Sequence, residues 1–573
     1  MNNRKPLAEA QDLHQKGRIK EAERRYRKLL KQAPGNPEIS FYLGLALLQT
    51  GRGREAVGHL ETVARVAPKD PIVQDHLGQA LLAAGEREKA IDRHMKAKAL
   101  APDKPEILFN LGVALEQSER LDEAEAEYRK TIGLAPAFFP AHANLGSVLL
   151  TKGRYREAEP LLRKACQLNP KAREPLANLA YLLFRVNRQE DADAALDALL
   201  RIAPAHPVGS LLEGRRKRRD GEGKAAIELF RRATVTADLP PRFAAEAWFE
   251  LGMLLDKERK FEQAFAAFEN MNRIFESLAR SANIDRQASP RRIETYRKWA
   301  AQRPETMHAT KPGDGTAPDS PVFFVGFPRS GTTLMEQIMA AHPKVATTNE
   351  ESPLDATLEH AEGLTGALSP QCLERLTEQQ RLELQRHFFG IARQVTASDL
   401  RGKLLVDKLP LNMVKTGAIP WIFPGSRVIA AIRDPRDACL SCFMQRFALN
   451  EAMIHFLTLE STATFYAQVM GLWLESRSKL SVPWIEYRYE DLVADFEGTA
   501  GRVLDFMGLS WDDEVTRYAK TARKREIRTP SHEAVTREIN DRAVSRWRNY
   551  ADQLAPILPV LEPFVREFGY EPS

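Results

Sequence analysis

The stretch Pro321–His342 reads PVFFVGFPRSGTTLMEQIMAAH and decides the fold of the second half of the chain. Its first residues, Pro321–Phe327, form an apolar run rich in valine and phenylalanine, which predicts a buried strand. A tight polar turn follows, and Thr332 and Thr333 then open an amphipathic helical pattern. A strand, a turn of small residues and a helix N-terminus make a cradle of free N–H groups that suits a phosphate.

The turn is related to the Walker loop, G-x-x-x-x-G-K-[ST], but lacks its lysine. Gly326 and Gly331 have the Walker spacing and Thr333 supplies the hydroxyl, whereas Thr332 stands where the lysine should be. That lysine reaches the outer phosphates of a nucleoside triphosphate beside magnesium. Its absence, with Arg329 inside the turn, predicts a phosphate ligand other than ATP or GTP. The alternative is an ordinary strand-to-helix turn capped by serine and threonine.

The composition describes a protein of two or more domains without a disulfide framework. At 573 residues the chain is too long for one core. Lys and Arg number 83 against 77 Asp and Glu, a formal net charge of +6, so nucleic-acid binding is not expected. Four cysteines indicate a reducing compartment. The C-x-x-C of Cys439 and Cys442 has no second ligand pair, which favours two buried helix thiols over zinc.

The N-terminus and the hydropathy pattern indicate no export or membrane signal. The first residues, MNNRKPLAEAQDLHQKG, lack the apolar region of a secretory signal peptide. No window approaches about 18 uninterrupted apolar residues, so no membrane span is expected. We therefore expect a cytoplasmic protein.

The first half of the chain repeats with a period of 34 residues. A unit of this length built from paired helices is typical of tetratricopeptide repeats. The small residues let two helices approach closely, and the proline ends the second helix of each unit. The positions that keep the period are Ala22, Ala56, Ala90, Ala124, Ala158, Ala192 and Ala226; Gly44, Gly78, Gly112 and Gly146, continued by Ala180 and Gly214; and Pro34, Pro68, Pro102, Pro136, Pro170 and Pro204.

The register of the repeats slips once before they end. Gly252 lies 38 residues after Gly214, which indicates a last repeat after a four-residue insertion. The pattern predicts a solenoid of about eight repeats over residues 6–277. A helical and Gly/Pro-rich linker is expected at 278–319, and a second domain at 320–573.

In the second domain, short apolar runs alternate with helical stretches. This alternation predicts an α/β domain with a parallel sheet and helices on both faces. The chain as a whole is thus expected to be an all-α solenoid followed by an α/β domain. The strand candidates are Val322–Phe327, Leu404–Val406, Val428–Ile432 and Trp484–Tyr487.

A second motif, RVIAAIRDPRDACLSCF at Arg427–Phe443, follows the same strand-to-helix plan. Its strand delivers Arg433 at the carboxyl end, where open α/β sheets place their ligands. Pro435 suits the first turn of the next helix, and Ser441 lies on that helix. A guanidinium and a hydroxyl that converge there could clamp a second phosphate. The alternative is a structural ion pair between Arg433 and Asp437.

Together, P-R-S-G-T-T-L after a strand and R-D-P-R-D-x-x-x-S about a hundred residues later resemble the sulfotransferase superfamily. The resemblance covers residues 321–570 and implies a P-loop-like sulfotransferase fold. It also implies that the first motif holds the 5′-phosphosulfate of 3′-phosphoadenosine-5′-phosphosulfate (PAPS) and the second its 3′-phosphate. Repeats before such a domain resemble bacterial tetratricopeptide-containing sulfotransferases. The donor-binding residues implied are Arg329, Ser330, Gly331, Thr332, Thr333, Arg433, Ser441, Tyr489 and Arg546.

Within the superfamily, the chain resembles the protein-tyrosine sulfotransferases. Their pattern continues through L-M and A-H-P to a pair of glutamates, the second of which is the general base. Counting from Arg329 places that base at Glu350, with Glu351 as the alternative; a solvated acidic turn is the remaining interpretation. His342, in the A-H-P context, is interpreted as a structural cap rather than a base.

Three further positions follow from the same resemblance. The family's N-K-D-P is similar to Asp407–Pro410, which makes Lys408 the residue expected to stabilise the leaving phosphate oxygen. A serine followed fifteen residues later by K-W is similar to Ser531 and Arg546 with its tryptophan, arginine replacing lysine. Tyr489 is similar to the tyrosine that packs against the nucleotide.

The sequence therefore predicts an enzyme that transfers a sulfuryl group from PAPS to an acceptor hydroxyl. We expect in-line attack on sulfur, Glu350 as base, Lys408 and Ser531 at the leaving oxygen, a positive field from Arg329, and no metal. A peptide or protein tyrosine is the preferred acceptor, because stacked helix pairs commonly bind peptides. A glycan or lipid hydroxyl, a P-loop kinase and a non-catalytic scaffold are the alternatives, and a homodimer is left open.

Overall fold

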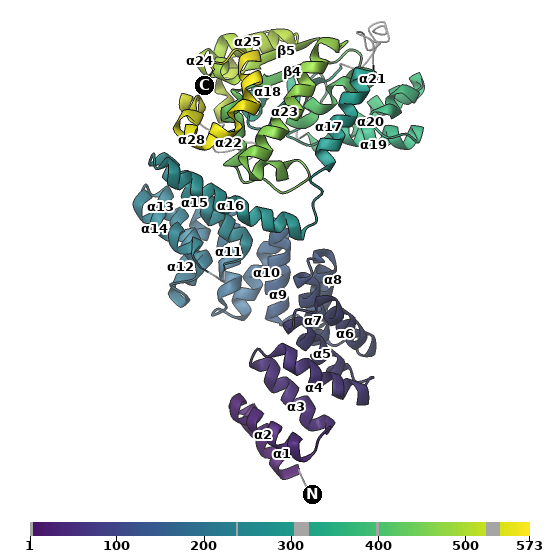
Figure 1. Ribbon diagram of the computed structural model, residues 1–573, viewed down its shortest axis with the longest axis vertical. Helices are drawn as coiled ribbons and strands as arrows, with labels where there is room; N and C mark the ends of the chain where they lie inside the picture. Colours follow the sequence, from purple (N-terminus) through teal and green to yellow (C-terminus); the bar gives the residue numbers. More distant parts are fainter. Residues whose placement is uncertain (1–3, 237–238, 303–319, 397–399, 523–538, 573) are drawn as a thin grey trace. The chain divides into compact units, whose positions relative to one another are not determined.

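The computed structural model describes residues 4–236, 239–302, 320–396, 400–522 and 539–572. By packing, the chain divides into two compact units, Met1–Asp238 and Leu239–Ser573. Helical repeats come first, and a domain with a parallel sheet follows (Figure 1). The predicted fold class is therefore confirmed. The predicted boundaries at residues 277 and 320 rest on the repeat pattern and stay predictions.

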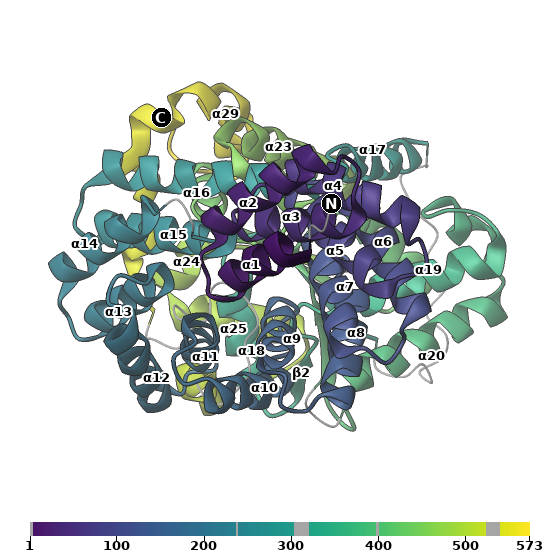
Figure 2. The ribbon, with the colours of Figure 1, turned by 90° about the horizontal axis from the view of Figure 1, so that it is seen from below.

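The first unit consists of helix pairs whose members lie side by side (Figures 1 and 2). Asn36 and Asp70 show how the sequence starts a helix: each side chain accepts from backbone N–H groups of the first turn, where Pro37 and Pro71 stand. Within residues 4–236 the helices are α1 (Arg4–Gln15), α2 (Ile19–Gln32), α3 (Pro37–Gln49), α4 (Gly53–Val66), α5 (Pro71–Ala83), α6 (Arg87–Leu100), α7 (Pro105–Gln117), α8 (Leu121–Leu134), α9 (Phe139–Thr151), α10 (Tyr155–Leu168), α11 (Arg173–Arg185), α12 (Gln189–Ile202), α13 (Pro207–Arg219) and α14 (Gly223–Thr234).

The periodic small residues lie where the two helices of a pair touch. A Cβ built on Gly112 of α7 would lie 2.6 Å from the ring of Tyr128 on α8. Tyr128 is fully buried, and its hydroxyl donates to Glu116 at 2.6 Å. The glycine is therefore required by close approach, as the period in the sequence predicts.

The second unit opens with helices that continue the repeat pattern. They are α15 (Pro241–Lys257), α16 (Phe261–Ser281) and α17 (Ala288–Ala301). The pair α15 and α16 contains Gly252 and Ala264, the positions shifted by the four-residue insertion. The Cβ position of Gly252 is closed by the ring of Phe268 at 2.8 Å, so the shifted pair packs as the others do.

A five-stranded parallel sheet forms the centre of the second unit. The strand order is β2-β3-β1-β4-β5, and Phe324 is in register with Lys408 while Gly326 is in register with Ala431. The four predicted strands are present, and β2 is the strand that the sequence analysis missed. The strands are β1 (Val322–Gly326), β2 (Val345–Thr347), β3 (Leu404–Lys408), β4 (Arg427–Ile432) and β5 (Trp484–Arg488).

The two faces of the sheet have separate cores. Phe324 packs with Met335 and Ile338 of α18 (Thr332–Ala341), together with α25 (Phe496–Phe506) and α26 (Tyr518–Ala522). Phe323 points the other way and contacts the rings of Phe388 and Phe423. The elements on this second side include α20 (Glu378–Val395), α21 (Ile419–Ile422), η2 (Pro410–Ala418), α22 (Pro435–Phe443) and α23 (Leu459–Ser476).

The chain thus leaves β1 toward one face and leaves β3 and β4 toward the other. In open α/β sheets, ligands bind at the carboxyl ends of the strands, at the point where the connections switch faces in this way. The remaining elements are α19 (Pro353–Thr365), η1 (Gln371–Arg375), η3 (Met453–Leu457), η4 (Arg477–Lys479), α24 (Tyr489–Ala494), η5 (Asp513–Arg517), η6 (Asp541–Ala543), η7 (Arg546–Tyr550), α28 (Ala551–Leu554), η8 (Ala555–Ile557) and α29 (Leu558–Glu567). Across the described ranges, no helix is both long enough and apolar enough for a membrane crossing.

Two glycine-to-alanine changes in the same helix pair should have opposite effects on stability. Gly112→Ala places a methyl group against the buried ring of Tyr128, so we expect a loss of about 1–3 kcal/mol. Gly133→Ala, in an exposed part of α8 with open space around it, should stabilise by about 0.5–1 kcal/mol. Urea unfolding of both variants measures the difference. Equal effects of the two changes would contradict the close-approach account.

Candidate active site

The turn after β1 has a backbone that only small residues permit at two positions. Gly331 is the N-cap of α18 and has φ +85°, in the left-handed region. A Cβ on Gly331 would lie 2.5 Å from the ring of Tyr489, and one on Gly326 would lie 2.9 Å from the carbonyl oxygen of Ala431. Arg329 also lies in the left-handed region, with φ +69°. The turn therefore packs tightly between β4 and Tyr489. Its left-handed backbone is held by this packing.

Three segments that are distant from this turn in the sequence meet at it: β4 with α22, Tyr489 and Ala543. The Arg329 Nε donates to Ser441 Oγ at 3.1 Å. Arg433 Nη1 donates to the carbonyl oxygen of Arg329 at 2.8 Å, and its Nη2 donates to that of Ala543 at 2.5 Å. The Arg433 guanidinium lies 5.0 Å from the centre of the Tyr489 ring, a cation–π distance. The structure thus brings together Arg329, Arg433, Ser441 and Tyr489, which the sequence placed in one donor site.

The electrostatics of this cluster favour an anion. Burial, together with the charges of Arg433 and Arg546, lowers the pKa of Arg329 to about 10. Arg433 is 6% exposed, and its Nε is buried with no hydrogen-bond partner among the described residues. A buried donor without a partner costs about 1–3 kcal/mol, which an anionic ligand would recover. The hydrogen bonds found for Arg433 go to carbonyl oxygens rather than to Asp437.

A buried lysine lies beside the turn, at the end of β3. Lys408 has no exposed surface, and its Nζ lies 2.8 Å from Glu336 Oε2 and 2.5 Å from Glu350 Oε1. Burial alone would lower the pKa of Lys408, but the two carboxylates outweigh it and the pKa lies above its usual value. Lys408 therefore carries its charge at neutral pH, held between one buried and one partly exposed carboxylate.

Glu336 is the residue of this group that sequence reasoning missed. Its side chain is 1% exposed, on α18, one turn beyond the threonines of the loop. The one signal in the sequence was a charged residue inside the apolar run LMEQIMAA. The partner that makes its burial tolerable is Lys408, which lies 72 positions away and has no local pattern that links it to Glu336.

The predicted base lies on a strained turn. Asn349 and Glu350 both have left-handed backbones, with φ +52° and +67°. Such residues cost about 1–3 kcal/mol each and occur where a side chain must be aimed. The turn directs Glu350 to Lys408, whereas the backbone N–H of Glu351 donates to the carbonyl oxygen of Thr348 at 3.1 Å. Glu350, the first of the two glutamates that the sequence left open, thus contacts Lys408.

The other predicted site residues lie in the loop, in η7 or outside the described residues. Ser330, Thr332 and Thr333 are buried in the loop and the first turn of α18. Arg546 opens η7, and its Nη2 lies 3.0 Å from Asp256 Oδ2 of α15. Ser531 lies outside the described residues.

The three residues interpreted as structural are His342, Cys439 and Cys442, and the structure shows contacts for two of them. His342 is the C-cap of α18; its Nδ1 accepts from the backbone of Lys344 at 3.2 Å, and its Nε2 lies 3.1 Å from the carbonyl oxygen of Ser510. Cys439 and Cys442 are buried on α22. The Cys442 thiol donates to the carbonyl oxygen of Pro328 at 3.3 Å, so it supports the turn after β1.

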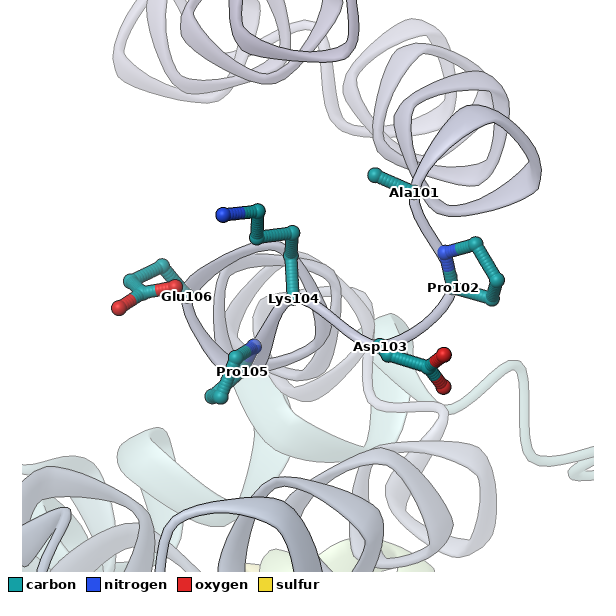
Figure 3. A pocket seen from close by; sticks show the side chains of 6 residues that line it. All are labelled: Ala101, Pro102, Asp103, Lys104, Pro105 and Glu106. Carbon is teal, nitrogen blue, oxygen red and sulfur yellow. The ribbon is translucent and has the colours of Figure 1, made fainter.

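Two other features of the described residues bear on where a ligand could bind. In the ranges that the structure describes, no group of three or more His, Cys, Asp or Glu residues is arranged to hold a metal ion. A shallow pocket lies at the turn between α6 and α7, lined by Ala101–Glu106. Its labelled side chains point in different directions, and the charged groups of Asp103, Lys104 and Glu106 do not converge (Figure 3).

Comparison with known families assigns both parts of the chain. Residues 321–513 match the sulfotransferase family. Residues 13–80 and 149–213 match one tetratricopeptide-repeat family, and 76–137 and 211–273 match another. The chain thus carries tetratricopeptide repeats followed by a sulfotransferase-family domain, as the sequence predicted.

Individual relatives are distant. A protein of Aquifex aeolicus, named only as uncharacterized, is 28% identical over 347 residues, which are 56% of this chain and 42% of its own length. Protein-tyrosine sulfotransferase A of Caenorhabditis elegans is 24% identical over 287 residues, 47% of this chain and 72% of its own. The crystal structure of a tetratricopeptide repeat protein from Parabacteroides merdae is 18% identical, covers 44% of this chain and 98% of its own, and has a TM-score of 0.36. The chain thus spans less than half the length of the Aquifex protein.

Replacing Asp407 by asparagine should change how stability depends on pH. Asp407 is buried and accepts from Thr348 Oγ1 at 3.0 Å, and burial raises its pKa to about 7. Its value in the unfolded chain is about 4, so the folded protein favours the neutral form. The stability that the neutral acid contributes is full below about pH 4 and is lost as the pH rises through 7.

Asp407→Asn removes this titration. Thermal unfolding of both proteins at pH 5 and pH 8 measures it, and the variant should gain stability relative to the natural protein at the higher pH. Parallel pH profiles of the two proteins would show that Asp407 does not titrate as described.

Proposed function

We propose that the chain transfers a sulfuryl group from PAPS to an acceptor hydroxyl. The observation that carries the proposal is the cluster of Arg329, Arg433 and Ser441 at the carboxyl ends of β1 and β4, next to Lys408 and Glu350. The arginines and Ser441 fit an anionic donor. Glu350 fits proton transfer, and Lys408 fits charge stabilisation. The match of residues 321–513 to the sulfotransferase family supports it independently.

The donor half has a place for each anionic group of PAPS. The turn after β1 and the N-terminus of α18 offer backbone N–H groups to the 5′-phosphosulfate, with Arg329 beside them. Arg433 and Ser441 suit the 3′-phosphate, and the buried Nε of Arg433 is a donor that such a group would satisfy. Tyr489, already against Gly331 and Arg433, suits the nucleotide base.

The transfer needs one proton acceptor and one cation. The acceptor oxygen attacks sulfur in line, its bond to sulfur forms as the bond from sulfur to the phosphate oxygen breaks, and 3′,5′-ADP leaves. Glu350 takes the proton of the acceptor hydroxyl. Lys408, kept charged by Glu336, offsets the charge that develops on the phosphate oxygen. Ser531 remains part of the proposal as a second donor to that oxygen.

A tyrosine of a peptide or protein is the acceptor that we favour. A phenol has a pKa of about 10, so a carboxylate in a dry site suffices as base. The C. elegans relative is named as a protein-tyrosine sulfotransferase, and repeats such as those of the first unit commonly bind peptides. A glycan or lipid hydroxyl is the second candidate, since the donor site does not select the acceptor. Four free cysteines support a cytoplasmic location as part of this proposal.

The donor assignment predicts a preference for 3′,5′-ADP that depends on Arg433. Calorimetric titration should show binding of 3′,5′-ADP and at least tenfold weaker binding of AMP, which lacks the 3′-phosphate. Arg433→Gln should weaken 3′,5′-ADP by about tenfold or more and leave AMP nearly unchanged, because one charge-assisted contact is worth about 1.5–3 kcal/mol. Tighter binding of ATP than of 3′,5′-ADP would favour the kinase alternative instead.

The base assignment predicts different behaviour for two adjacent glutamates. Glu350→Ala should lower the turnover number by at least a hundredfold, because general-base catalysis typically contributes about 10²–10⁴. Binding of 3′,5′-ADP should change little, and Glu351→Ala is the matched control that should keep most of its turnover. Loss of turnover in the Glu351 variant with retention in the Glu350 variant would reverse the assignment.

A further inference from the structure

The last repeat-like helix pair packs directly on the sulfotransferase-family domain within the second unit. Phe265 of α16 stacks on Phe443 at the end of α22, with ring centres 4.9 Å apart. Phe261, also on α16, lies 5.4 Å from the ring of Tyr550 in an edge-on arrangement. Aromatic pairs of this kind add about 0.5–1.5 kcal/mol each beyond the area they bury. The pair α15 and α16 is thus joined to the elements that carry the donor residues.

One carboxylate of this pair reaches a donor residue. Asp256 lies in the last turn of α15, and its Oδ2 lies 3.0 Å from Arg546 Nη2. Its other oxygen accepts from the Tyr550 hydroxyl at 2.6 Å. The side chains of Asp256 and Arg546 are only 19% and 22% exposed, so solvent screens this ion pair weakly. No local pattern near Arg546 in the sequence predicted Asp256 as its partner.

Arg546 needs such a partner because of where it lies. Its charge acts on Arg329, which is also close to Arg433, so three guanidinium groups approach one another. Like charges at such distances repel, and an untethered arginine side chain would turn toward solvent. Asp256 offsets the repulsion and holds Arg546 in place before any ligand binds. This is preorganisation of an anion site by a carboxylate outside it.

A second contact from the same pair reaches the other side of the donor cluster. Asn272 of α16 is buried, and its Nδ2 donates to the carbonyl oxygen of Phe443 at 3.0 Å. Phe443 is the last residue of α22, where carbonyl groups have no partner inside the helix. Ser441, which bonds Arg329, lies two residues before it. Asn272 therefore fixes the end of the helix that presents Ser441.

We infer that α15 and α16 form part of the donor site, with Asp256 as the positioning residue that holds Arg546 beside Arg329 and Arg433. The inference rests on the proposed function, since it concerns how the donor is bound. It assigns to the last repeat-like pair a role in nucleotide binding, distinct from any contact that the repeats make with an acceptor.

A double-mutant cycle on the full chain tests the inference. Calorimetry gives the Kd of 3′,5′-ADP for the natural protein, Asp256→Asn, Arg546→Gln and the double variant. Asp256→Asn should raise Kd by about tenfold, because Arg546 is no longer held in place. In the Arg546→Gln background the same change should have less than a twofold effect, since Asp256 acts through Arg546. A merely structural role would give the same loss in both backgrounds.

A matched control comes from another ion pair of the same helix. Glu246 of α15 has a buried side chain and lies 2.9 Å from Arg446. Glu246→Gln should lower the melting temperature but change Kd by less than twofold, and Asp256→Glu, which keeps the charge, should recover part of the lost affinity. Melting curves confirm that each variant is folded.

Three results would overturn the inference. An unchanged Kd in Asp256→Asn would show that Asp256 does not position Arg546, while the proposed function would stand. A lower Kd would show that Asp256 competes with the nucleotide for Arg546. Absence of 3′,5′-ADP binding by the natural protein would reject the proposed function together with the inference.

Discussion

The second unit depends on one constraint: several positive charges lie together at the carboxyl ends of its strands. Arg329, Arg433 and Arg546 repel one another, so each must be held by its surroundings. Arg433 donates to two carbonyl oxygens, Arg329 bonds Ser441, and Arg546 pairs with Asp256. Free energy from packing stabilises this arrangement in advance, so a bound anion meets charges already in position.

Lys408 is also held in place by its neighbours, but here the negative charges outnumber the positive one. Here one buried cation lies between two carboxylates, and the strained turn at Asn349 and Glu350 holds the more exposed of them. Because Glu336 also contacts Lys408, the lysine would keep one carboxylate partner if Glu350, the proposed base, turned to an acceptor. Arg329 and Arg433 thus follow β1 and β4, whereas Lys408 ends β3 and Glu350 lies in the turn after β2.

Most of the fold could be predicted from local sequence patterns. The 34-residue period predicted the helix pairs, and apolar runs predicted β1, β3, β4 and β5. The three-residue β2 was missed because a strand so short has no periodicity of its own. Glu336 and Asp256 were missed for another reason. Their roles come from Lys408 and Arg546, 72 and 290 positions away, and packing at that range leaves no spacing in the sequence.

Transfer of ³⁵S-labelled sulfate from PAPS tests the central claim most directly. The full chain is incubated with labelled PAPS and, separately, with a tyrosine peptide, a glycan, a lipid extract and the cell lysate as acceptors. The account predicts label in the tyrosine peptide, with loss of transfer when Glu350 is replaced. Label that enters only carbohydrate or lipid would contradict the preferred acceptor. Absence of label in every acceptor, with 3′,5′-ADP unbound, would contradict sulfuryl transfer itself.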